Sequence, residues 1–100
     1  MIKRFCIIFL LVLPFLQLHA QTDLELRGDD EYKAGNFQAA WNYFNEAVKT
    51  DTANIALWYK MGESAREFYN YNTAFQCFRI VYEKDLNEKF PLTLFWMAEL

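Results

Sequence analysis

The chain has 100 residues, of which 54% are hydrophobic, and its 13 acidic residues outnumber its 10 basic residues to give a formal net charge of −3. This length allows one small domain. The acidic excess argues against sequence-independent binding to nucleic acid or to anionic lipid, because both require a basic surface.

Residues 1–20 have the pattern of a secretory signal peptide. Two basic residues open the segment, a long apolar run follows, and the small residue Ala20 closes it. The apolar run is interrupted by Pro14 and is shorter than the roughly 20 residues that cross a bilayer. We therefore expect cleavage after Ala20 and export of residues 21–100, without a transmembrane segment.

Removal of the leader changes the charge and the cysteine content. Lys3 and Arg4 leave with it, so the formal charge of residues 21–100 becomes −5, which favours basic partners. Cys77 is then the one remaining cysteine and cannot form an internal disulfide. We expect Cys77 to be a small core residue on a helix rather than a reactive thiol.

The first part of the exported segment predicts a pair of helices. Residues 23–34 form the first helix, with acidic side chains near its start and Gly35 as its stop. Asn36 is placed to cap a second helix over residues 37–48, where apolar residues recur at the helical period. The polar stretch 50–54 supplies the turn that follows.

A second pair of helices follows the same scheme. Apolar residues recur at helical spacing over 57–68 and again over 71–82, on either side of a turn at Tyr69 and Asn70. The large aromatic residues at these spacings are expected to be packing residues rather than a ligand cage. They are Trp41, Phe44, Trp58, Phe75 and Phe78.

The two pairs superpose when the chain is shifted by 34 residues. The identical positions are Gly28 and Gly62, Asn36 and Asn70, Ala40 and Ala74, Phe44 and Phe78, and Asp51 and Asp85. Glycine and alanine at such positions allow two helices to approach closely, and phenylalanine fills the space beside them. A fixed repeat of this length is typical of stacked helical hairpins.

A third unit begins near Phe90, and Pro91 is expected at its first helical position. The apolar side chains of Phe95, Trp96 and Leu100 then lack part of their cover. We expect further repeats or a partner protein to cover them, because soluble monomers avoid such patches.

The second repeat resembles the tetratricopeptide (TPR) family, through Trp58-x-x-Met61-Gly62-x-x-Ala65 and Ala74-x-x-x-Phe78. The resemblance implies an all-α fold of antiparallel helix-turn-helix repeats, stacked as a short right-handed solenoid of about two and a half repeats. Repeat one would cover about 22–53, repeat two about 54–87 and a partial repeat three about 90–100. The chain departs from the family pattern at several positions, which are Leu24, Arg27, Thr52, Tyr69 and Leu86.

The leader and the stretch Phe90 to Glu99 suggest a narrower resemblance, to the amino-terminal repeats of exported TPR/OmpA-type envelope proteins, some of them associated with type IX secretion and gliding. This implies a location in the periplasm or at the outer membrane. Two functions are compatible with it. One is a non-catalytic protein-protein interaction scaffold, and the alternative is a structural spacer of a larger OmpA-type envelope, secretion or gliding assembly.

Residues that carry catalysis are scarce. The only histidine, His19, lies in the leader, and Ser64 is the only serine. Acyl-transfer triads and histidine-containing zinc sites are therefore not expected. The three glycines are too far apart for a phosphate loop. We expect no enzyme activity, no cofactor and no metal.

The resemblance also implies a concave groove formed by the first helix of each repeat. Its lining would be Glu25, Asp29, Tyr32 and Lys33 from repeat one and Tyr59, Glu63, Arg66 and Glu67 from repeat two. An acidic and aromatic groove suits an extended protein segment that bears lysine or arginine. The alternative interpretation is an ordinary solvated helix surface with charges at spacings of three and four.

Overall fold

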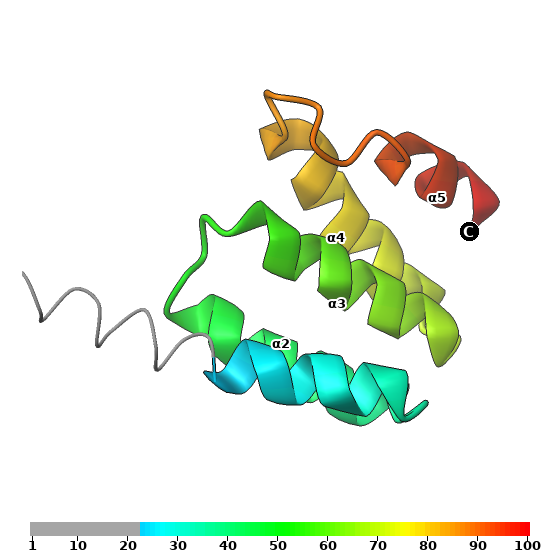
Figure 1. Ribbon diagram of the computed structural model, residues 1–100. Helices are drawn as coiled ribbons and strands as arrows, with labels where there is room; N and C mark the ends of the chain where they lie inside the picture. The colour runs from blue at the N-terminus through cyan, green and yellow to red at the C-terminus, as the bar shows by residue number, and fades with distance from the viewer. Residues whose placement is uncertain (1–22) are drawn as a thin grey trace, which may run out of the picture.

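The computed structural model describes residues 23–100, which are all helices and turns without a strand (Figure 1). A first helix occupies residues 23–33, and it is followed by α2 (Phe37–Lys49), α3 (Ile55–Glu67), α4 (Tyr71–Lys84) and the short α5 (Thr93–Glu99). The predicted all-α class is confirmed. The predicted signal peptide lies outside the described residues, and within 23–100 no helix is long and apolar enough to cross a membrane.

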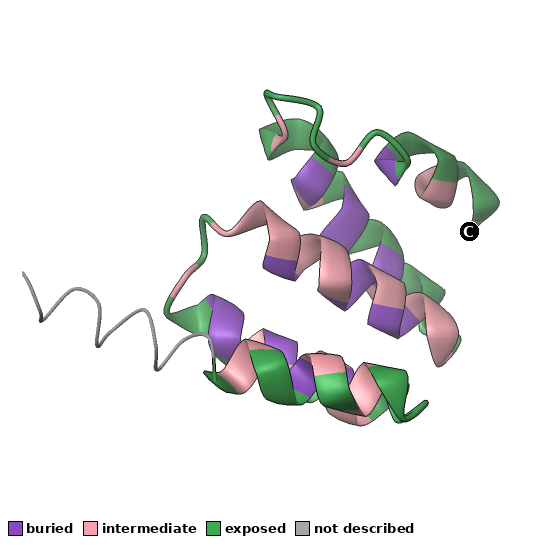
Figure 2. Cartoon of the chain, in the orientation of Figure 1, coloured by how far each residue is buried: buried purple, intermediate pink, exposed green. Residues whose placement is uncertain are grey.

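The helices form successive antiparallel neighbours. Helix α3 packs against both α2 and α4, and α5 packs against α4. In Figure 1 the first helix lies in front of α2, and α3 lies in front of α4. Figure 2 places the buried residues where these helices face one another, whereas the loop between α4 and α5 is largely exposed.

The turns within the two hairpins have the same geometry. Gly35 has a φ of 83°, and the N–H of Asn36 donates to the carbonyl of Glu31 at 2.9 Å. Thirty-four residues on, Tyr69 has a φ of 67°, and the N–H of Asn70 donates to the carbonyl of Ala65 at 2.9 Å. This bond pattern is a Schellman ending, in which a left-handed residue satisfies the last carbonyls of a helix.

Asparagine precedes three of the helices, but only two of these side chains cap. The side-chain oxygens of Asn54 and Asn70 each accept from the backbone N–H three residues on, at 3.3 Å. Asn36 was predicted to do the same, and this prediction is wrong. Its amide nitrogen donates to the carboxylate of Glu31 at 2.9 Å, so a bond to the preceding helix replaces the cap.

The core consists of two clusters that meet at Trp41. One cluster lies between α2 and α3 and contains Phe44, and the other lies between α3, α4 and α5 and contains Phe78. A Cβ atom at Gly28 would come within 2.4 Å of the Phe44 ring, and one at Gly62 within 2.6 Å of the Phe78 ring. The predicted close approach at both glycines is confirmed, and the neighbour is a phenylalanine ring in each case.

Phe75 and Cys77 lie two residues apart on α4, on different sides of the helix, and differ in burial. Phe75 is 38% exposed, so its prediction as a core residue is wrong. The apolar residues of α4 extend around more of the helix than the neighbouring helices cover. The side of α4 that carries Phe75 and Tyr71 is therefore exposed to solvent. Cys77 is buried as predicted, and burial raises the pKa of its thiol to about 11, against a smaller opposing effect of Trp41.

Helix α5 begins later than predicted. It starts at Thr93, and Pro91 lies in the preceding turn. The hydroxyl of Thr93 donates to the carbonyl of Phe90 at 2.7 Å and closes this turn. Trp96 and Leu100 pack against the second core cluster, whereas the neighbouring Phe95 is exposed.

Candidate functional site

The residues that were predicted to line a groove lie on the first helix and on α3, and an ion-pair cluster joins these two helices. The ammonium of Lys60 on α3 donates to the carboxylate of Glu25 at 2.9 Å and to that of Asp29 at 2.8 Å. All three side chains are about 70% covered. Burial tends to lower the pKa of Lys60, but the hydrogen bonds with Asp29 and Glu25 outweigh it, so the pKa is raised. Two of the predicted groove carboxylates are therefore already occupied.

A small hollow lies beside this cluster, lined by Tyr32 and Glu63 together with Asp29, Phe44 and Lys60. Its volume is about 110 Å³, which is about the volume that four water molecules occupy in liquid water. That is too small for a drug-sized ligand, whose pockets measure about 300–1,000 Å³. The end of one side chain fits this space.

Glu63 is the predicted groove carboxylate that has no ion pair or hydrogen bond within residues 23–100. Burial raises the pKa of Glu63, and the charges of Arg66 and Lys60 only partly oppose this effect. Burial also raises the pKa of the facing Tyr32 hydroxyl, and the negative charge of Glu63 raises it further. A partly desolvated carboxylate thus lies beside an aromatic ring.

Arg66 pairs with Glu67 and stacks on Trp96 of α5. A guanidinium nitrogen of Arg66 lies 2.9 Å from the Glu67 carboxylate, and the guanidinium carbon lies 3.9 Å from the centre of the Trp96 ring. Stacking of arginine on tryptophan is a favourable cation–π contact. These two residues therefore border Glu63 but are held by the protein itself.

Tyr59 and Lys33 are placed differently from the groove prediction. The Tyr59 hydroxyl accepts from the indole N–H of Trp96 at 2.9 Å, and its ring stacks on Phe90 at 4.7 Å. Tyr59 consequently contacts α5 and the loop before it. Lys33 is exposed near the end of the first helix. The structure thus brings Tyr32 and Glu63 together, and Tyr59, which lies within electrostatic range of both, makes its hydrogen bond and ring contact with Trp96 and Phe90.

The sequence interpretation missed Lys60 and Trp96. Lys60 lies 35 residues from Glu25 and 31 from Asp29, and Trp96 lies 37 residues from Tyr59. These separations are close to the repeat length of 34. The signal was therefore present, because stacking of equivalent helices places residues about one repeat apart next to each other.

The described residues contain no group of three or more His, Cys, Asp or Glu side chains that could hold a metal ion. No protein-family model, no curated protein and no solved structure matches the chain. The site combines charged and aromatic side chains of the first helix, α3 and α5.

Proposed function

We propose that this chain is a TPR-like helical-repeat scaffold that is exported to the periplasm or outer membrane and binds an extended, basic segment of another protein. The recurrence of the Gly28–Phe44 contact as Gly62–Phe78, together with the repeated turn at Gly35 and Tyr69, supports stacked repeats. The leader pattern of residues 1–20 supports export.

The observation that carries the binding proposal is the position of Glu63. It is partly buried, it lines with Tyr32 a hollow that fits one side-chain end, and it makes no ion pair with any of residues 23–100, although the charges of Lys60 and Arg66 are near. A lysine or arginine from the bound segment would pair with this carboxylate and lie against the aromatic ring. The pairs of Lys60 and Arg66 fix the two walls beside it.

Binding can be tested with a ten-residue threonine-rich peptide that contains one central lysine, titrated into the ¹⁵N-labelled full chain. We expect amide shifts in residues 25–33 and 60–67, and Glu63→Gln should weaken binding about tenfold, as expected for loss of a hydrogen bond to a charged group. Glu99→Gln, an exposed carboxylate on α5, is the control. Replacement of the peptide's lysine by norleucine should have the same effect as Glu63→Gln.

Two further readouts separate binding from stability. Because the pKa of Glu63 is raised in the folded state, its charge costs stability at pH 7, and this stability is regained as the pH falls through the raised pKa and is complete below the unfolded pKa of about 4.5. Glu63→Gln should therefore keep or increase the free energy of unfolding at pH 7 while it weakens binding. Binding should also decline as the pH falls through the raised pKa. If Glu63→Gln and the parent bound the peptide with equal affinity, the proposal that the peptide binds at Glu63 would be wrong.

The second candidate function, a spacer within a larger OmpA-type envelope, secretion or gliding assembly, is favoured by the exposed apolar residues of the third unit. Leu92, Leu94 and Phe95 are all more than half exposed. In a spacer these residues would pack against the next structural unit. Retained assembly of the envelope complex in a strain with Glu63→Gln, and its loss with Phe95→Glu, would favour this alternative.

A further inference from the structure

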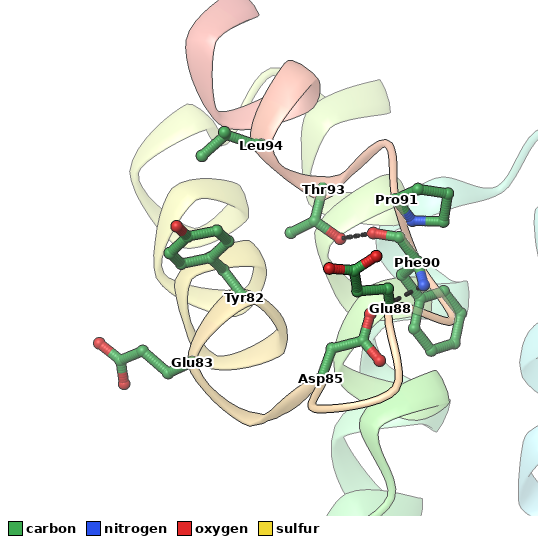
Figure 3. Close-up of a pocket in the computed structure, with 8 residues that line it drawn as sticks. All are labelled: Tyr82, Glu83, Asp85, Glu88, Phe90, Pro91, Thr93 and Leu94. Carbon is green, nitrogen blue, oxygen red and sulfur yellow. Dashed lines mark hydrogen bonds between the residues drawn. The ribbon is translucent and has the colours of Figure 1, made fainter.

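A second hollow lies outside the groove, between the end of α4, the loop after it and the start of α5 (Figure 3). Its volume is about 590 Å³, within the range of about 300–1,000 Å³ that is usual for ligand pockets. Tyr82, Pro91 and Leu94 form apolar parts of its wall, and Glu83, Asp85 and Glu88 supply its charged groups.

Hydrogen bonds within the loop define the shape of this hollow. The Asp85 carboxylate accepts the backbone N–H groups of Lys89 at 2.9 Å and Phe90 at 2.8 Å. The Thr93 hydroxyl then ties the start of α5 to the Phe90 carbonyl at 2.7 Å. The wall is therefore formed before a ligand arrives, which reduces the entropy lost on binding.

The charge of the hollow has one sign, because three carboxylates and no basic side chain line it. Asp85 is occupied by the loop, and Glu83 lies 4.0 Å from Arg79 and points away from the hollow in Figure 3. The Glu88 side chain makes no hydrogen bond or ion pair within residues 23–100, and its carboxylate extends toward Tyr82. Glu88 is the carboxylate left for a ligand.

The apolar part of the wall is open to contact. Tyr82 and Leu94 are each 57% exposed, although both are large hydrophobic side chains. A tyrosine face attracts a cation, and an adjacent leucine can cover the methylene stem of a long cationic side chain. The wall and the charge together complement a side chain with an apolar stem and a cationic end.

We propose that this hollow binds a lysine or arginine side chain of a protein partner, with the cation at Glu88 and over Tyr82 and with an apolar neighbour of that residue on Leu94. The site shares no residue with the groove between the first helix and α3. It gives the chain a second contact point for a basic partner, independent of the groove.

The test uses an acetylated, amidated peptide of sequence Gly-Leu-Lys-Leu-Gly and the ¹⁵N-labelled full chain. Amide shifts should fall in residues 82–94. Glu88→Gln should weaken binding at least about fivefold through loss of a charge-assisted hydrogen bond. Glu83→Gln, on the same rim but pointing away, should stay within about twofold of the parent. Tyr82→Leu keeps an apolar surface, and it should also weaken binding because it removes the aromatic face.

Several results would overturn the proposal. Equal affinity for a norleucine version of the peptide would show that charge is not recognised, and equal affinity of Glu88→Gln and the parent would assign the contact elsewhere. Shifts at residues 82–94 that grow with protein concentration alone would mean that a second copy occupies the hollow. The amide shifts of residues 82–94 should be the same in Glu63→Gln as in the parent, whatever happens at residues 25–33 and 60–67, so failure of the groove proposal is distinguishable from failure of this one.

Discussion

At the scale of single residues, two turns contain a non-glycine residue in a backbone conformation that favours glycine. Tyr69 and Glu88 have φ angles of 67° and 51°, in the left-handed region that favours glycine. The equivalent turn of the first hairpin has Gly35 at 83°. Tyr69 is 77% exposed, so its ring contributes little burial in return for this conformation.

We expect Tyr69→Gly to raise the free energy of unfolding by about 0.5–1 kcal/mol. A non-glycine residue in the left-handed region costs about 1–2 kcal/mol, part of which is offset by the greater freedom of glycine in the unfolded chain. Urea denaturation followed by circular dichroism measures the change. Asn72→Gly, on the exposed side of α4, is the control and should lower stability by about 0.3 kcal/mol, because glycine is only slightly less favourable than asparagine in a helix. A drop in stability for Tyr69→Gly would contradict the assignment of strain to this turn.

At the scale of elements, the antiparallel pairs depend on the absence of a side chain at two positions. Gly28 and Gly62 each face a phenylalanine ring at a distance that excludes a Cβ atom. Because α3 and α4 approach closely at Gly62, the Phe78 side chain is completely buried against α3. The glycines thus determine how closely two helices pack, although glycine inside a helix costs about 1 kcal/mol relative to alanine.

We expect Gly62→Leu to lower the free energy of unfolding by about 2 kcal/mol. The gain in helix propensity is about 1 kcal/mol at most, whereas a side chain inserted against the Phe78 ring costs typically 1–3 kcal/mol and also disturbs neighbouring contacts. Thermal melting and urea denaturation measure the effect. Ala98→Leu is the control at an exposed helical position and should change stability by less than about 0.5 kcal/mol. Unchanged stability of Gly62→Leu would disprove the close-packing argument.

At the scale of the whole molecule, polar contacts join the three helical units. Lys60 ties α3 to the first helix, and the Tyr59–Trp96 hydrogen bond with the Arg66–Trp96 stack ties α3 to α5. Each contact connects residues about one repeat apart in the chain. These polar contacts have specific partners and directions. They therefore restrict the relative orientation of the helices more strictly than the apolar core does alone.

We expect Lys60→Met to lower the free energy of unfolding at pH 7 by about 1 kcal/mol, because it leaves Glu25 and Asp29 unpaired while solvent still screens them. The pKa of Lys60 is raised in the folded state, so its contribution is present below the unfolded pKa of about 10.4 and is lost as the pH rises through the folded pKa. The stability difference between the parent and Lys60→Met should therefore shrink at pH 11 and above.

Lys49→Met provides the matched control for this prediction. Lys49 pairs with Glu46 at 2.7 Å, but both side chains are mostly exposed and belong to the same helix. Exposed pairs of this kind contribute about 0–1 kcal/mol. A loss for Lys60→Met no greater than that for Lys49→Met would mean that the Lys60 cluster does not fasten the two helices.

The sequence by itself determined the helical elements and their turns. Period and turn chemistry placed two hairpins with boundaries at Gly35 and Tyr69, and the repeated glycine and phenylalanine positions indicated where helices approach closely. These features depend on residues within one or two turns of one another. They can therefore be recognised without knowledge of the neighbouring helices.

Only the tertiary structure decided which side chains meet across the helices. Phe75 has core spacing but lies on an uncovered flank, Lys60 pairs with two predicted groove carboxylates, and Tyr59 accepts a hydrogen bond from Trp96 of α5. The helical period predicts the apolar face of a helix, but the edges of that face are uncertain by one or two side chains. The packing of the other helices decides which of its side chains are buried. For this reason Glu63 is, among the carboxylates predicted to line the groove, the one that is partly buried and makes no ion pair with any of residues 23–100.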